Sequence, residues 1–302
     1  MKILLTGANG LIGQKLKQEL LLKPAVQLIA TSRSKEINPL QKAYTFEQLD
    51  ITHPDQVQQC IDTHRPEVII HTAAQANVNY CEQHKEECYA VNTEAVRTLT
   101  EFSNQYNMHL IHFSTDFIFD GKQPPYQEND LPNPVNYYGQ TKADAENLLR
   151  EHANQYTILR PILVFGYFKG MKRDNLVTWV VKSLANRKPI KVVNDQYRCP
   201  TLAEDIARLT SEMAGKKQTG VFHICGKESL SIYDLAIRTA EHFQLNTQLI
   251  TPVTSKELNE IAARPANTCF TLHKIKEAID YQPTDLDHGL KMIRQQYSKN
   301  IH

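Results

Sequence analysis

Short apolar runs alternate with amphipathic stretches through the first half of the chain, and this alternation limits the fold more than any other feature. The apolar runs cover residues 3–5, 26–31, 68–74, 110–113 and 156–164, and the amphipathic stretches cover residues 11–22, 54–64, 85–106 and 138–152. Strands that alternate with helices at this spacing pair in parallel, because each helix carries the chain back across the sheet. The sequence therefore predicts an α/β protein with a doubly wound parallel sheet.

The pattern changes beyond residue 166. A charged loop, "GYFKGMKRDN", precedes a predicted helix near residues 175–186, and Thr201, Ser231 and Thr284 stand where later helices need caps. Single strands are predicted near residues 190–193 and 220–225. We therefore predict two domains, residues 1–166 and a smaller mixed α/β domain of residues 167–302, with some chain crossing between them.

The composition narrows the range of functions. The 302 residues are 41% hydrophobic and 22% charged with a net charge of +1, which gives no electrostatic reason to bind nucleic acid or an anionic membrane. The first apolar run is too short for a secretion signal. The six cysteines form no Cys-x-x-Cys pair, and the histidines have no metal-ligand spacing. We expect a cytoplasmic protein with reduced cysteines and no metal site.

The segment "TGANGLIG" lies between the first predicted strand and the first predicted helix, with glycines at every third position. Glycines at such a turn let the backbone approach a pyrophosphate, whose charge is met by free N–H groups at a helix N-terminus. A tight strand-to-helix turn without a ligand is the alternative. In a Rossmann-type domain the segment predicts these dinucleotide contacts: Gly7, Asn9, Gly10, Leu11, Ile12 and Gly13.

The end of the second predicted strand indicates which dinucleotide binds. An NAD site places an acid about 20 residues beyond the glycines, but this strand ends in "TSRS" with Ser32 and Arg33. Arg33 is suited to a 2′-phosphate, so we favour NADP(H) and leave NAD(H) open. An exposed loop arginine with no ligand is the alternative reading of Arg33.

Two further segments complete the predicted cofactor site. Asp50 and Ile51 follow the presumed third strand, where adenine usually lies, although Asp50 is equally suited to a turn before the next helix. Ala73, Ala74 and Gln75 close the fourth strand, and the small alanines let backbone pass close to a cofactor. Ordinary helix–sheet packing explains the alanines equally well.

Tyr138 and Lys142 lie four residues apart at the start of a predicted helix, in "NYYGQTKADAE". Chance alone accounts for such a pair, but residues four apart share one helix face, and an ammonium favours loss of a phenol's proton. Ser114 and Thr115 end the fifth predicted strand, where open α/β sheets bind ligands, although either hydroxyl is equally suited to a local cap. The order of glycine loop, strand-end hydroxyl and Tyr-x-x-x-Lys raises the pair above chance.

Together these stretches resemble the extended short-chain dehydrogenase/reductases, and within them the dTDP-4-dehydrorhamnose reductase-like branch. The resemblance covers residues 3–276 and rests on "TGANGLIG", "VNYCE", "STDFIFDG", "NYYGQTKADAE", "LRPILVFG", "NDQYRCPT" and "RPANTCF". It implies a nucleotide sugar held between the two domains, with Thr115 orienting the carbonyl, Tyr138 donating a proton and Lys142 anchoring the cofactor. The substrate contacts that it implies are Thr115, Asp116, Asn175, Arg198 and Arg264, with Arg173 as a further candidate for the diphosphate.

Several positions on the substrate side depart from the family pattern. Leu163 stands where the family carries a tryptophan against the sugar, Asn79 replaces an aspartate, and Tyr197-Arg198 replaces a segment that usually begins with glycine. The resemblance therefore supports the chemistry better than the identity of the substrate. It implies reduction of a 4-keto-6-deoxy nucleotide sugar, with dTDP-4-dehydrorhamnose, which would give dTDP-L-rhamnose, as the first choice.

Two other functions stay open. The regulatory subunit of methionine adenosyltransferase resembles the same branch and binds NADP without obvious turnover; Leu163 favours this function slightly, whereas Thr115, Tyr138 and Lys142 argue against it. A nucleotide-sugar epimerase keeps NAD bound, and "TSRS" argues against that function. A homodimer is expected from the family alone.

Overall fold

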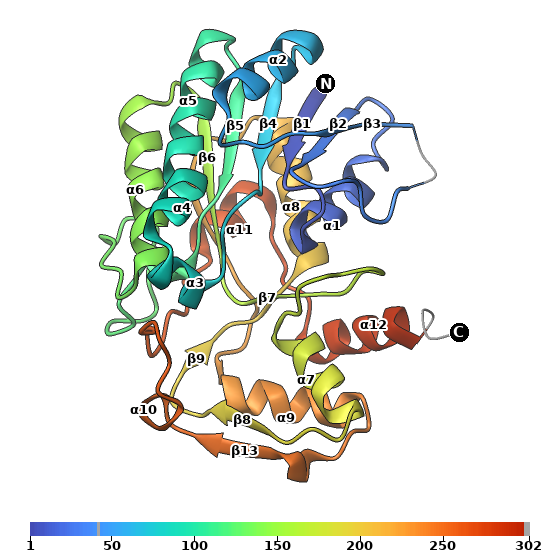
Figure 1. Ribbon diagram of the computed structural model, residues 1–302, viewed down its shortest axis with the longest axis vertical. Helices are drawn as coiled ribbons and strands as arrows, with labels where there is room; N and C mark the ends of the chain where they lie inside the picture. Colours follow the sequence, from blue (N-terminus) through green and yellow to red (C-terminus); the bar gives the residue numbers. More distant parts are fainter. Residues whose placement is uncertain (41–42, 299–302) are drawn as a thin grey trace.

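The computed structural model describes residues 1–40 and 43–298, which form a seven-stranded parallel sheet with helices on both faces (Figure 1). The strand order is β11-β6-β5-β4-β1-β2-β3, so the chain starts in the middle of the sheet, runs to one edge and returns to β4 beside β1. The strands are β1 (Lys2–Thr6), β2 (Gln27–Ser32), β3 (Thr45–Gln48), β4 (Val68–His71), β5 (His109–Phe113), β6 (Tyr156–Pro161) and β11 (Gly220–Ile224). This arrangement confirms the predicted fold class.

Side chains alternate between two buried layers, as successive residues of a strand must. Ile3 and Leu5 pack with α1 (Leu11–Leu20), α8 (Ala203–Lys216) and α11 (His273–Ile279). Leu4 packs on the other face with α2 (Pro54–His64), α5 (Ala95–Gln105) and α6 (Tyr137–His152). The short helices α3 (Val78–Gln83) and α4 (Lys85–Tyr89) and a π-helical segment (Ala90–Glu94) lead into α5. None of the helices within residues 1–40 and 43–298 is both long and apolar enough to cross a membrane.

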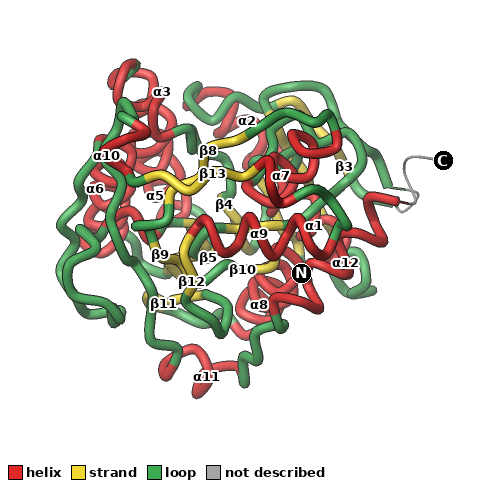
Figure 2. The backbone as a smooth tube through the Cα atoms, turned by 90° about the horizontal axis from the view of Figure 1, so that it is seen from below, coloured by secondary structure: helices red, strands yellow, loops and turns green. Residues whose placement is uncertain are grey.

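A smaller group of elements lies below the carboxyl ends of the strands (Figure 1). Its centre is the parallel pair β8 (Ile190–Val193) and β13 (Ile250–Val253), beside which lie α7 (Leu176–Ala185) and α9 (Ile232–His242) (Figure 2). The other elements outside the large sheet are β7 (Val164–Phe165), β9 (Tyr197–Arg198), β10 (Thr201–Leu202), β12 (Leu230–Ser231), α10 (Ser255–Leu258), α12 (Leu286–Ser298) and a 3-10 turn at Thr247–Leu249. A second 3-10 turn, at Asp116–Ile118, follows β5.

The chain returns to the large sheet after entering the smaller group. Strand β11, predicted as part of the second domain, pairs with β6, and α8 packs against α1. The crossing places residues 203–224 with the large sheet, while the division at residue 166 itself stays a prediction.

The structure bears out one of the three predicted helix caps. Ser231 forms a capping box with Asp234 at the start of α9. Thr201 lies in β10 and its hydroxyl donates to the carbonyl of Ile162, while Thr284 donates to the carboxylate of Asp205. Tertiary hydrogen bonds thus use the two hydroxyls that local sequence assigned to caps, and those two predictions were wrong.

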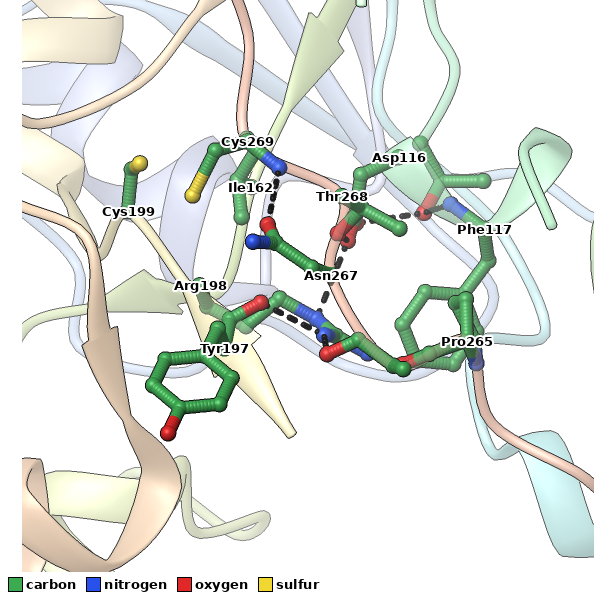
Figure 3. A network of polar contacts seen from close by, with 12 residues as sticks. Asp116, Phe117, Ile162, Tyr197, Arg198, Cys199, Pro265, Asn267, Thr268 and Cys269 are labelled. Atoms are coloured by element: carbon green, nitrogen blue, oxygen red, sulfur yellow. Dashed lines mark hydrogen bonds and ion pairs between the residues drawn. The ribbon is translucent and has the colours of Figure 1, made fainter. Parts of the chain in front are cut away.

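A buried ion pair joins the end of β5 to the smaller group of elements (Figure 3). The carboxylate of Asp116 lies 3.3 Å from Nε of Arg198 in β9, and the two side chains are 4% and 3% exposed. The guanidinium also donates to the carbonyls of Pro265 and Ala266, and the Thr268 hydroxyl donates to Asp116. Because an unpaired buried charge is costly, each partner constrains where the other can lie.

Breaking this buried pair should cost far more than breaking an exposed pair of the same length. The exposed pair Arg97–Glu94 has the same 3.3 Å distance from Nε to the carboxylate, with side chains 45% and 47% exposed. We expect Arg198→Met to lower the free energy of unfolding by about 3–5 kcal/mol, because it leaves the buried carboxyl group of Asp116 without its cation. Arg97→Met should cost less than about 1 kcal/mol.

Urea unfolding of both single variants and of Arg198→Met/Asp116→Leu measures these values. The double variant should recover part of the loss, since it removes the orphaned charge. Equal costs for Arg198→Met and Arg97→Met would show that burial of the pair does not matter.

Candidate active site

A cavity of about 670 Å³ opens at the carboxyl ends of β1, β4 and β5. Residues 161–164 and 168–176 form its other side. Twelve of the residues predicted from the sequence line it: Asn9, Gly10, Leu11, Ile12, Gly13, Ala74, Thr115, Asp116, Tyr138, Lys142, Arg173 and Asn175, and so does Ser114, the other strand-end hydroxyl. Nine lie outside its lining: Gly7, Ser32, Arg33, Asp50, Ile51, Ala73, Gln75, Arg198 and Arg264. The cavity therefore brings together the glycine loop, the strand-end hydroxyl and the Tyr-Lys pair.

The three glycines of the loop have different roles. Gly7 has a φ of +70°, and a Cβ there would lie 2.6 Å from the backbone nitrogen of Ala73. A Cβ on Gly13 would lie 2.3 Å from the carbonyl oxygen of Gly7. A Cβ on Gly10 would meet only that same oxygen, at 3.2 Å. The fold thus requires glycine at positions 7 and 13. Gly10 adds no side chain to the wall of the cavity, so a ligand can approach the backbone there.

The first turn of α1 faces this cavity with its backbone N–H groups. Its N-cap is Gly10, so no side chain caps the helix, and Leu11, Ile12 and Gly13 line the cavity. Uncapped N–H groups and the positive end of the helix dipole favour an anion. This end of the cavity is built to hold a phosphate group.

The loop after β2 is tied to the glycine loop and offers no free carboxylate. The Asn9 side chain donates to Ser34 and Lys35 and accepts from the N–H of Ile37. Glu36, the first acid after β2, pairs with the buried ammonium of Lys17 at 2.9 Å. Since that acid is neutralised by helix α1, it is not poised to hold ribose hydroxyls.

Arg33 lies at the end of β2 as an exposed residue, next to Ser32. Its positive charge acts on Asp50, which follows β3, and on Tyr80 in α3. Hydrogen bonds from Thr52 lower the pKa of Asp50 although burial opposes them. Asp50 thus serves the turn before α2, as its alternative reading predicted, and Ile51 is buried.

The residues after β4 are fixed by backbone packing and by Asn92. Ala73 lies against Gly7, and Ala74 lines the cavity. The backbone of Gln75 donates to the side-chain oxygen of Asn92 at 2.8 Å and accepts from its side-chain nitrogen at 3.0 Å. The positions of Ala73 and Ala74 are therefore compatible with both predictions, close packing against the neighbouring backbone and close approach of a cofactor.

Tyr138 owes its position to the N-terminus of α6. Asn136 caps this helix by accepting from the N–H of Gly139 at 2.8 Å. A Cβ on Gly139 would lie 2.1 Å from the carbonyl oxygen of Phe117, so glycine allows α6 to approach the turn that follows β5. This close approach brings the Tyr138 phenol beside the Thr115 hydroxyl.

Burial decides the protonation of Tyr138. It raises the pKa of the phenol well above its usual value, and the neighbouring Thr115 hydroxyl lowers it only in part. The net shift is therefore upward, whereas a nearby ammonium by itself favours loss of the phenol's proton. Tyr138 therefore holds its proton at neutral pH.

Lys142 lies one helical turn below Tyr138 and is almost completely buried. Burial lowers the pKa of its ammonium to about 7, against the opposing charge of Glu146. Its Nζ lies 3.0 Å from Nε2 of His112 in β5. Sequence reasoning considered His112 only as a metal ligand and missed this contact, which the strand register could have indicated.

The predicted substrate residues differ in whether other protein groups already occupy their hydrogen-bonding atoms. Arg173 is exposed, donates to the carbonyl of Ala76 across the cavity, and lines it. Asn175 lines the cavity while it caps α7. Arg264 pairs with Glu260 and donates to the side chain of Asn79, outside the cavity lining. Arg198 is committed to Asp116 and to backbone carbonyls, as described above.

The far wall of the cavity includes residues that sequence reasoning did not single out. Phe168, Met171 and Lys172 come from the charged loop before α7, while Thr72 after β4 and Phe113 in β5 line the side formed by the sheet. Leu163, at the position of the family tryptophan, also lines the cavity and has a φ of +37°. Non-glycine residues rarely adopt this conformation, and such residues cluster at ligand sites.

One group of metal-ligating side chains lies far from this cavity. The ligand atoms of Glu47 in β3 and of Cys60 and His64 in α2 are all within 4.8 Å of one another. His64 Nε2 and a carboxylate oxygen of Glu47 are hydrogen bonded to each other at 2.6 Å, so two of the three potential ligand atoms already have a protein partner. The sequence did not indicate this cluster, because its members come from different elements.

Comparisons with known proteins identify the family of this chain. The family model for the RmlD substrate binding domain matches residues 1–299. A dTDP-4-dehydrorhamnose reductase from Aggregatibacter actinomycetemcomitans is 33% identical over 97% of this chain and 98% of its own length. Methionine adenosyltransferase 2 subunit beta from Danio rerio is 28% identical over 93% of this chain and 87% of its own.

The fold is also found among solved structures. The crystal structure of dTDP-4-dehydrorhamnose reductase from Bacillus anthracis in complex with NADP has a TM-score of 0.83 and 27% identity, and the match covers 97% of this chain and 98% of that one. With a family model that matches nearly the whole sequence, the chain belongs to the RmlD substrate binding domain family.

Proposed function

We propose that this chain is an NADP(H)-dependent reductase of a 4-keto-6-deoxy nucleotide sugar, with dTDP-4-dehydrorhamnose as the first substrate to test. The observation that carries the proposal is that Thr115, Tyr138 and Lys142 line the same cavity as the uncapped N-terminus of α1. A proton donor and an anion site on one wall suit a carbonyl reductase that uses a phosphorylated cofactor.

The cofactor fits the residues at two points. The first turn of α1 would hold the pyrophosphate, and Gly10 leaves room for it there. Arg33 would pair with the 2′-phosphate, because Glu36 is neutralised by Lys17 and cannot repel it. The relative from Bacillus anthracis, solved with NADP, supports this choice over NAD(H).

The reduction needs one hydride and one proton at the keto group. When bound, a reduced nicotinamide supplies the hydride to the carbonyl carbon. Tyr138 donates its proton to the carbonyl oxygen, and burial keeps that proton in place until then. Thr115, beside the phenol, orients the same oxygen, and Lys142 provides the positive charge beneath Tyr138.

A non-catalytic NADP-binding subunit is the second candidate. The similarity to methionine adenosyltransferase 2 subunit beta and the replacement of the family tryptophan by Leu163 favour it. The intact Thr115, Tyr138 and Lys142 favour the enzyme. A cytoplasmic location and a homodimer belong to the same proposal and follow from the family alone.

Replacing Tyr138 by Phe should abolish turnover and spare cofactor binding. We expect NADPH consumption with dTDP-4-dehydrorhamnose to fall by at least about 100-fold, the usual contribution of a general acid. The Kd for NADPH, measured by fluorescence, should stay unchanged. Tyr137→Phe is the matched control, since that ring lies next in sequence but packs under Lys85. Undiminished turnover by Tyr138→Phe would reject the mechanism, and inactive wild-type protein that binds NADPH would favour the regulatory subunit.

Arg33 should set the preference between the two dinucleotides. Loss of a charge-assisted contact to the 2′-phosphate in Arg33→Met should weaken NADPH binding by about 10–100-fold and leave NADH binding unchanged. Fluorescence titration with both cofactors measures this. Arg65→Met, which removes another exposed arginine at the end of α2, should change neither Kd. Equal losses for NADPH and NADH would assign Arg33 to the fold and not to the phosphate.

A further inference from the structure

Three polar side chains form a row across the sheet beneath the active-site cavity. Thr6 in β1 is in register with His71 in β4, and His71 is in register with His112 in β5. All three are at most 1% exposed, and they follow Leu4, Ile69 and Leu110 at every second position. They therefore point to the face of the sheet that α6 covers.

Contacts connect this row from the glycine loop to Lys142. The Thr6 hydroxyl lies 2.8 Å from Nδ1 of His71, and the rings of His71 and His112 are stacked with centroids 5.4 Å apart. His112 Nε2 then lies 3.0 Å from the ammonium of Lys142. The row begins at the residue before Gly7 and ends at the lysine of the Tyr-Lys pair.

The chemistry of the last contact fixes the state of His112. An ammonium has hydrogen-bond donors only, so whenever Lys142 carries its proton, Nε2 of His112 must be the acceptor and the imidazole is neutral with its proton on Nδ1. Burial and the charge of Lys142 keep it neutral by lowering the pKa of His112 well below its usual value. Within the described residues, neither Nδ1 of His112 nor Nε2 of His71 has a hydrogen-bond partner.

Unpartnered buried nitrogens lower stability, so an apolar pair at these two positions would suit the core better. The histidines are thus better explained by what they do for Lys142 than by packing. Among the described residues, Glu146 is the carboxylate whose charge stabilises the ammonium. Glu146 faces Lys142 from the same helix, but Arg160 and Arg150 bind both of its oxygens. Cys88 is the remaining ionisable neighbour that acts on the lysine.

We propose that His112 is a positioning residue whose neutral imidazole accepts a hydrogen bond from Lys142 and holds the ammonium in place beneath Tyr138. Thr6 and His71 hold the imidazole in the row. Strand β5 thereby positions two groups of the site, the Thr115 hydroxyl at its end and, through His112, the lysine of the facing helix. The catalytic meaning of this contact rests on the proposed function, whereas the contact itself does not.

Two spectroscopic measurements test the contact without any substrate. In wild-type protein labelled with ¹⁵N-histidine, His112 should show the tautomer with the proton on Nδ1. In protein labelled with ¹³Cε-lysine, the Lys142 resonance, identified by its loss in Lys142→Arg, should titrate near pH 7. A proton on Nε2 of His112, or a charged imidazole at pH 7, would overturn the proposal even if no variant folded.

Variants separate the hydrogen bond from general packing. His112→Leu removes the acceptor, so the ammonium is less stable and its titration should move down by about one to two pH units. His112→Gln keeps an acceptor oxygen and should stay close to wild type. His109→Leu is the matched control, because it removes a buried imidazole of the same strand that contacts Thr157 instead. An unshifted titration in His112→Leu, or an equal shift in His109→Leu, would overturn the proposal.

The same variants connect the contact to turnover. The alkaline limb of the pH profile for NADPH consumption should move to lower pH in His112→Leu, because Lys142 loses its proton earlier, and not in His112→Gln or His109→Leu. Absence of turnover in wild-type protein would reject the proposed function and leave the lysine titration to decide the role of His112. A shifted titration with an unshifted limb would reject the catalytic role of the contact.

Discussion

Strand β5 and the three residues after it set the geometry of the whole site. His112 points to α6 with Nε2 3.0 Å from Nζ of Lys142, Ser114 faces the buried Glu146 of the same helix, and Thr115 lies beside Tyr138. Asp116 then turns to Arg198 and ties the strand to the smaller group of elements. Because side chains of a strand alternate and the backbone is rigid, a shift of β5 would move every one of these groups at once.

The electrostatics of the site follow from burial more than from the Tyr-x-x-x-Lys spacing. Both groups lose solvation, which raises the pKa of the phenol and lowers the pKa of the ammonium. A sequence argument that counts only the attraction between the two groups gives the wrong sign for Tyr138. Burial instead leaves a tyrosine that keeps its proton above a lysine near its midpoint at neutral pH, which suits reduction of a carbonyl.

Periodicity predicted the sheet, its helices and the order of the site along the chain, because each depends on residues close in sequence. Periodicity gave wrong predictions where residues distant in sequence determine the pairing of a strand or the hydrogen bonds of a side chain. The run at residues 220–224 looks like any short strand, and its place in the large sheet is set by pairing with β6. Thr284 looks like a helix cap, but Asp205 binds it from another element. The sequence showed no partner for His112, and only the three-dimensional structure places its Nε2 beside the ammonium of Lys142.

The arginines show how burial separates residues that sequence ranks together. Arg173 and Arg198 both lie in segments predicted to meet a diphosphate, and each carries the same charge. Arg198 is buried and paired, so moving it to a ligand would leave the buried carboxyl group of Asp116 without its cation. Arg173 is exposed and uses one donor on the carbonyl of Ala76 at the cavity, which a phosphate would replace with a stronger, charge-assisted bond. The exposed arginine is therefore the freer of the two to meet an anion, and the buried one ties the end of β5 to the smaller group of elements.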